Sequence, residues 1–96
     1  MQNARVTNRR TASTLNGKTK VNRTWWTVEV EGRTLTVSAA VAAKVRCSTV
    51  TVLEGSTVLA NLDAAPDGNT ARVVAALAAA GVTVDADTLG WDGCTV

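Results

Sequence analysis

The amino-acid sequence predicts a small α+β domain with the element order ββαββα plus a short C-terminal strand, behind an extended basic N-terminal arm. Two runs of alternating apolar and polar residues, each broken by a Glu-Gly turn signal, predict two β-hairpins. Two Ala- and Val-rich stretches with helical spacing predict the two helices. A chain of 96 residues suits one domain, so we expect a flexible or docking arm at 1–24 and a single α+β domain at 25–96.

The first hairpin is predicted around a two-residue loop at Glu31-Gly32. Such a loop pairs Val28 with Leu35 and Trp26 with Val37, which places all four apolar side chains on one face of the hairpin. The residues that alternate with them are mostly Thr and Glu, so the opposite face is polar.

A short helix is predicted over residues 39–46, directly after this hairpin. Ser38 is a good N-cap, and Val41 and Val45 have the i, i+4 spacing of one helix face. Lys44 in the last turn suits the negative end of the helix dipole.

The second hairpin is predicted between Ser48 and Leu62, with a break at Glu54-Gly55-Ser56. A two-residue loop would mix apolar and polar side chains on each face, so a three-residue loop is favoured. The three-residue loop pairs Val52 with Val58 and Val50 with Ala60.

A second helix is predicted from about Ala71 to Ala80, with Asn69 or Thr70 as its N-cap and Gly81 as its end. The residues Val82-Thr83-Val84 then predict the short C-terminal strand. The apolar stripe of this helix consists of Val73, Val74 and Leu77.

Charge is divided unevenly along the chain, whose net charge is +2. Residues 25–96 carry four cations and eight acids, whereas residues 1–24 carry cations only. The arm is also poor in apolar residues, so it gains little from burial and is expected to order only against a partner. We expect it to bind phosphate groups or an acidic protein surface. Its cations are Arg5, Arg9, Arg10, Lys18, Lys20 and Arg23.

The Trp25-Trp26 pair lies where the arm meets the first strand. Alternation sends the two rings to opposite faces, so one belongs in the core and the other on the outer face. We expect Trp25 to be covered by the arm, by a neighbouring subunit or by a ligand. Simple packing is one interpretation; a stacking platform for single-stranded nucleic acid beside basic residues is the other.

Catalysis, cofactors and metals have little support. The chain has no histidine, which excludes Ser-His and Cys-His nucleophilic chemistry and His-ligated metals. Glycines occur singly at turns, so no phosphate-binding loop is present. Cys47 and Cys94 are two unpaired thiols or one disulfide, and a solvated turn is favoured over a calcium site for Asp85, Asp87 and Asp92. We therefore expect a protein that is not an enzyme and that has no cofactor and no metal.

Composition bears on the source and the compartment. Ala, Val and Thr supply 46 of the 96 residues, while Ile, Phe and Tyr are absent, which indicates a GC-rich genome such as that of an actinobacterium or one of its phages. The first 24 residues contain no signal-peptide segment, and no apolar run reaches the length of a membrane span. We expect a soluble protein of the bacterial cytoplasm or of a virion.

The favoured hypothesis for function is a structural or assembly protein, most concretely a capsid-bound minor or decoration protein of a phage that docks through its arm. Its small Ala- and Val-rich core favours reliance on a larger protein assembly or on a homo-oligomer. One alternative is a nucleic-acid-binding regulator that uses the basic arm and Trp25. Another alternative is a small inhibitor of a host protein. No membrane partner and no small-molecule substrate is expected.

Overall fold

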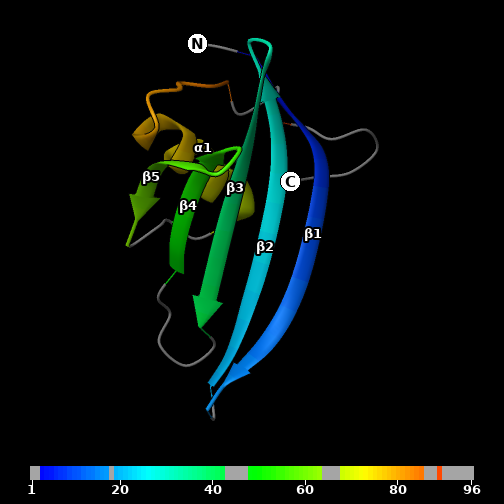
Figure 1. Cartoon of the computed structure of the whole chain (residues 1–96), viewed down its shortest axis with the longest axis vertical. Helices are drawn as coiled ribbons and strands as arrows, with labels where there is room; N and C mark the ends of the chain where they lie inside the picture. Colours follow the sequence, from blue (N-terminus) through cyan, green and yellow to red (C-terminus); the bar gives the residue numbers. More distant parts are fainter. Residues whose placement is uncertain (1–2, 18, 43–47, 64–67, 86–88, 90–96) are drawn as a thin grey trace.

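The computed structural model describes residues 3–17, 19–42, 48–63, 68–85 and 89, which form one five-stranded antiparallel sheet and one helix. The strands lie in the sheet in chain order, so each strand pairs with its neighbour in sequence (Figure 1). The elements are β1 (Ala4–Asn16), β2 (Thr19–Val30), β3 (Arg33–Ala42), β4 (Ser48–Glu54), β5 (Thr57–Leu62) and α1 (Asn69–Ala79).

The β2–β3 hairpin has the predicted register. Val28 pairs with Leu35 and Trp26 pairs with Val37, around a two-residue turn at Glu31-Gly32. Both turn residues have positive φ angles, 50° and 72°, which is the geometry whose twist matches that of the flanking strands. We call the face of the sheet that carries Trp26 the inner face, and the opposite face the outer face.

The predicted ββαββα order is wrong at its first helix. β3 continues through Ala42, and residues 43–46 of the predicted helix lie outside the described residues. Alternate residues remain buried along β3 as far as Ala39. Val41 pairs with Asn22 on one side and with Ser48 on the other, so β3 is an interior strand here. Pairing on both edges outweighs the helix propensity of the Ala-rich segment.

The predicted register of the β4–β5 hairpin is also wrong. Val52 pairs with Ala60 rather than Val58, and a two-residue turn at Gly55-Ser56 joins the strands. The register shifts between Val52 and Leu53, where β5 carries one extra residue. The bulge changes which residues of β5 point to the inner face, so a two-residue turn is compatible with a uniformly apolar inner face.

The extended basic arm of the predicted fold is part of the sheet. Residues 4–16 form β1, and residues 19–24 form the first half of β2. Thr residues recur through this segment and favour extended backbone, while β2 supplies hydrogen-bonding partners along all of β1. A two-residue turn after Asn16 begins at Gly17, which has a φ of 64°.

The single described helix confirms the second predicted helix and its end. Gly81 adopts a φ of 85°, and its N–H donates to the carbonyl of Ala78 while that of Val82 donates to the carbonyl of Leu77. The N-cap position is Gly68, with no side-chain cap, rather than Asn69 or Thr70. The predicted strand after the helix is absent from the described residues, where Val84 makes only an isolated bridge. No described helix is long and apolar enough to span a membrane.

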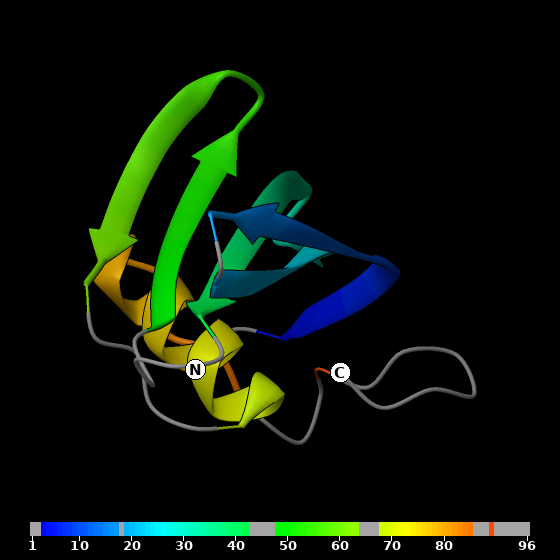
Figure 2. The same cartoon turned by 90° about the horizontal axis from the view of Figure 1, so that it is seen from below.

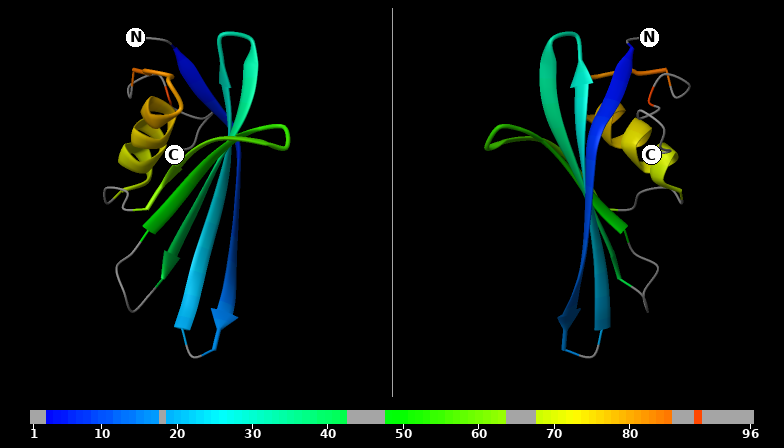
Figure 3. Two further views of the ribbon diagram at one scale, coloured as in Figure 1. Left: turned by 60° about the vertical axis from the view of Figure 1, so that its left-hand side comes forward. Right: turned by 90° about the vertical axis from the view of Figure 1, so that its right-hand side faces the viewer.

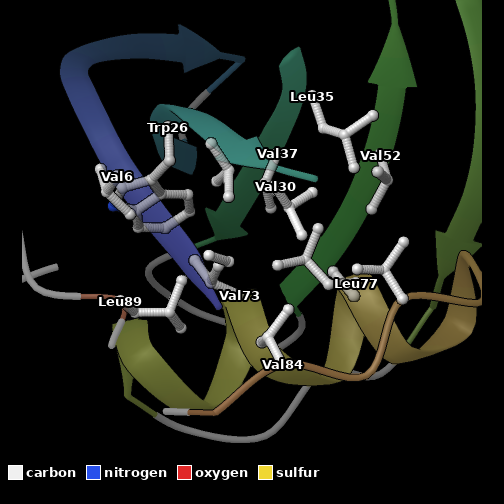
Figure 4. Close-up of a cluster of buried hydrophobic side chains, with 14 of the residues drawn as sticks. Val6, Trp26, Val30, Leu35, Val37, Val52, Val73, Leu77, Val84 and Leu89 are labelled. Atoms are coloured by element: carbon white, nitrogen blue, oxygen red, sulfur yellow. The ribbon is translucent and has the colours of Figure 1, made fainter. Parts of the chain in front are cut away.

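The hydrophobic core lies on the inner face. α1 packs across β3, β4 and β5, with Val73 and Leu77 fully buried (Figures 3 and 4). After α1, Val82, Val84 and Leu89 are also buried in the core, and Leu89 lies beside Val6 and Trp26 (Figure 4). The N–H of Val6 donates to the carbonyl of Leu89 at 3.4 Å. No described element covers the outer face (Figure 2).

Two identical substitutions test this division between core and surface. Leu77→Ala should lower the free energy of unfolding by about 3 kcal/mol, because Leu77 is fully buried between α1 and the sheet. Leu15→Ala should change it by less than about 0.5 kcal/mol, because Leu15 is 75% exposed. Urea unfolding followed by circular dichroism measures both values, and equal losses would contradict the assignment of the core.

Candidate docking site

The part of the β1–β2 hairpin farthest from the helix is the strongest candidate for a functional site. We call residues 9–16 and 19–24 the distal hairpin. Every described side chain of β1 from Arg9 to Leu15 is exposed, on both faces of the strand. β3 supports the β2 side of this region as far as the pair Val21–Ala42, and the hydroxyl of Ser13 donates to Asn22 at 2.8 Å. Figure 3 shows the end of this hairpin extending well beyond α1.

Four cations of the arm lie on the distal hairpin. The register places Arg10 and Arg23 on the outer face, and Arg9 and Lys20 on the inner face beyond the core. Neither strand of the distal hairpin carries an acid. The region is therefore positively charged on both faces.

The other two predicted cations are not part of this cluster. Arg5 lies near the opposite end of β1, where it pairs in register with Glu29. Lys18 lies outside the described residues. Of the six predicted partner-binding cations, four therefore lie together on the distal hairpin, and their role in binding stays a prediction.

Trp25 directly follows the β2 segment of the distal hairpin and is half-buried on the outer face. The guanidinium carbon of Arg10 lies 4.5 Å from the centre of the Trp25 ring, in a cation–π contact. Trp26 is fully buried on the other face, which confirms the predicted division of the two rings. Of the three predicted covers for Trp25, the structure shows the arm itself.

The opposite end of the sheet carries mixed charge. A shallow hollow of about 380 Å³ surrounds the β2–β3 turn and is lined by Arg5, Glu29, Glu31 and Arg33, among others. Arg33 also donates to Glu54, with Nε to Oε2 at 2.9 Å and Nη2 to Oε1 at 3.2 Å. The two cations and two acids of the lining oppose each other, so this hollow offers no net charge for a ligand.

Metal binding has no support among the described residues, where no three His, Cys, Asp or Glu side chains lie close enough to hold an ion. Asp85 is described, whereas Asp87 and Asp92 lie outside the described residues. Cys47 and Cys94 also lie outside them, so their pairing stays open.

Sequence reasoning missed that the arm is a hairpin. The dipeptide Asn16-Gly17 is a turn signal, and it lies between two Thr-containing stretches that could have been recognised as strands. The frequent cations and the low number of apolar residues obscured this pattern, because neither strand shows a regular apolar face here.

The contact between Arg10 and Trp25 can be checked by NMR. The δ-methylene protons of Arg10 should resonate upfield of their usual position, because the guanidinium group next to them lies over the face of an indole ring. Trp25→Leu should remove this shift and leave the signals of the buried Trp26 ring in place. An Arg10 side chain without an upfield shift in the unmodified protein would show that the stacking does not persist in solution.

The ion pair at the other end of the sheet predicts a pH dependence. The hydrogen bonds from Arg33 lower the pKa of Glu54, and the charge of Arg33 adds to this effect while desolvation opposes it. Because the folded-state pKa is depressed, the stabilisation is present above the ordinary Glu pKa and is lost as pH falls through the folded-state value. Arg33→Gln should raise the Glu54 pKa in a carboxyl ¹³C titration. Thr34→Ala, at an exposed neighbouring position, should leave it unchanged.

Comparison with protein-family models, with curated proteins and with solved structures finds no match for this chain. No family assignment therefore adds to the geometry and charge of the described residues.

Proposed function

We propose that this chain is a non-enzymatic assembly protein that docks on a larger protein structure through its distal hairpin. Its most concrete form is a capsid-bound minor or decoration protein of a phage. The observation that carries the proposal is that the distal hairpin is exposed on both faces, lies outside the core and is positively charged without any acid.

Energetics favour a partner for this region. β3 pairs with β2 only as far as Val21, so beyond this residue the hairpin is a two-stranded ribbon, which is only marginally stable when no hydrophobic face supports it. β1 has no buried side chain between Arg9 and Leu15, so the backbone ladder to β2 provides most of its order. The exposed β1 side chains become buried only when the surface of a partner covers them. A component docked on a protein shell is covered in this way.

The charge of the distal hairpin indicates the kind of surface. Arg10 and Arg23 point to one side of the ribbon, and Arg9 and Lys20 to the other. An acidic groove can engage both sides at once, and opposite charge accelerates the encounter of the two proteins. The cations also oppose docking on a basic surface, so they contribute to specificity.

Nucleic-acid binding is the second candidate, because the same four cations could contact phosphates. Two observations weigh against it. The Arg10 guanidinium stacks on Trp25, so this face of the ring is occupied and not open to a base. The described helix carries only one cation, Arg72, and lies away from the distal hairpin, so it does not resemble a groove-reading helix.

Neutralising the exposed cations should prevent incorporation into virions. The variant Lys20→Gln/Arg23→Gln removes two positive charges from positions that make no contribution to the core. The control Thr70→Glu/Thr83→Glu lowers the net charge equally at exposed positions on the helix and just after it. Virions are produced from the phage genome that encodes the chain, then purified and analysed by quantitative mass spectrometry. They should contain the control variant and lack Lys20→Gln/Arg23→Gln.

The same pair of variants separates the two candidate functions. Binding to double- and single-stranded DNA across a salt series should be negligible at about 100 mM salt if the partner is a protein. Equal incorporation of both variants, or absence of the unmodified chain from the particles, would refute the docking proposal. Tight, salt-dependent DNA binding that Lys20→Gln/Arg23→Gln abolishes would favour the second candidate.

A further inference from the structure

The outer edge of β1 faces no other strand among the described residues. β1 is the first strand of the sheet, and 12 of its 13 residues pair with β2. The Asn16–Thr19 pair closes a two-residue turn, so both of its members bond across the hairpin. Backbone direction alternates along a strand, so the N–H and C=O groups of Thr11, Ser13 and Leu15 point away from β2.

These outward groups have no partner among the described residues. The backbone bond between Val6 and Leu89 occupies the edge only near the start of β1. A register shift between Val6 and Asn8 then separates that part of the edge from the distal part. From Thr11 to Leu15 these outward groups alternate along about 14 Å of the strand, at about 3.4 Å per residue.

Charge limits what can pair with this edge. Exposed strand edges tend to associate, and charged side chains on the edge strand restrict that association. Arg9 and Arg10 lie on β1 itself, and Lys20 and Arg23 lie on the neighbouring strand. A second copy of β1 would bring the same cations together without any acid, so like charges oppose pairing between two copies.

The opposite edge of the sheet differs in each of these respects. β5 has six residues and no charged side chain, and its register is interrupted by the bulge next to the turn. It also lies against α1, which contacts it from the inner face. The two edges are therefore not equivalent, and only the β1 edge is both long and strongly charged.

We propose that the outer edge of β1 accepts an extended acidic segment of a partner protein as a sixth strand of the sheet. This inference rests on the docking function proposed above and specifies how the distal hairpin engages its partner. The backbone of the added strand bonds to Thr11, Ser13 and Leu15. Its acidic side chains lie on one face beside Arg10 and Arg23, or on the other beside Arg9 and Lys20.

A synthetic ten-residue peptide of alternating Val and Glu is the first probe. It should slow amide hydrogen exchange at Thr11, Ser13 and Leu15, whose N–H groups are otherwise open to water. At a peptide concentration about ten times the dissociation constant, the exchange should slow about tenfold. A Val-Lys peptide of the same length should leave the exchange of these three amides unchanged.

Two polyanions that cannot pair as a regular strand serve as further controls. Polyglutamate and a 12-base-pair DNA duplex are attracted by the same cations, but they should not slow exchange at alternate residues of β1. Protection of these amides by DNA, or by the Val-Lys peptide as well, would refute strand addition. Slow exchange in the free protein at micromolar concentration, together with a dimer in sedimentation, would show that a second copy occupies the edge and would also refute it.

The variant Thr11→Pro tests the edge directly. Proline removes an outward N–H and leaves the β1–β2 ladder intact, because Thr11 does not donate to β2. It should weaken binding of the Val-Glu peptide by about tenfold, whereas Thr11→Ala should bind normally. Unchanged affinity of a folded Thr11→Pro variant would overturn the proposal.

Incorporation into virions distinguishes this inference from the proposed function. If Thr11→Pro is excluded while Thr11→Ala is incorporated, docking and strand addition both stand. If Thr11→Pro is incorporated normally while Lys20→Gln/Arg23→Gln is excluded, the docking function stands and strand addition is wrong. If all of these variants are incorporated normally, both are wrong.

Discussion

The alternation of side chains along β2 is the constraint on which the rest of the structure depends. β2 pairs with β1 on one edge and with β3 on the other, so its register orients both neighbours at once. The register aligns Trp26 with Val37 and, through β3, with Val52, and all three side chains are fully buried. A slip of one residue would expose Trp26 and bury Trp25 together with its stacked Arg10, at a large cost in free energy.

The same long strands serve two regions with different sources of order. Near α1, side chains from β3, β4 and the helix bury one another, and hydrophobic contact stabilises the sheet. In the distal hairpin the ladder of backbone hydrogen bonds continues, but the side chains of β1 from Arg9 to Leu15 remain in water. The packed part of the sheet near α1 can therefore keep the distal hairpin extended without covering the side chains of that hairpin. Those side chains stay accessible.

Only part of the candidate site could be predicted from the sequence. The excess of cations at the N-terminus follows from residue counts, and the opposite orientations of Trp25 and Trp26 follow from period two. The separation of Arg5 from Arg9 and Arg10 does not. Those three residues are close in sequence, but the strand is extended and places Arg5 beside Glu29, which is 24 positions away in the chain. A count of charges along the sequence groups Arg5 with Arg9 and Arg10, because it ignores the distance between them in the extended strand.

Local patterns determined the β2–β3 hairpin and α1, because the turn at Glu31-Gly32 and the end at Gly81 depend on backbone preferences of a few adjacent residues. Tertiary structure alone decided three other features. β3 extends through an Ala-rich segment because it has partners on both edges, and the bulge on β5 reconciles a short turn with the apolar face. β1 is a strand because β2 bonds to its backbone, although its side chains show no apolar periodicity. In each case the stabilising hydrogen bonds come from residues of another strand, so the local pattern of side chains carries little information about them.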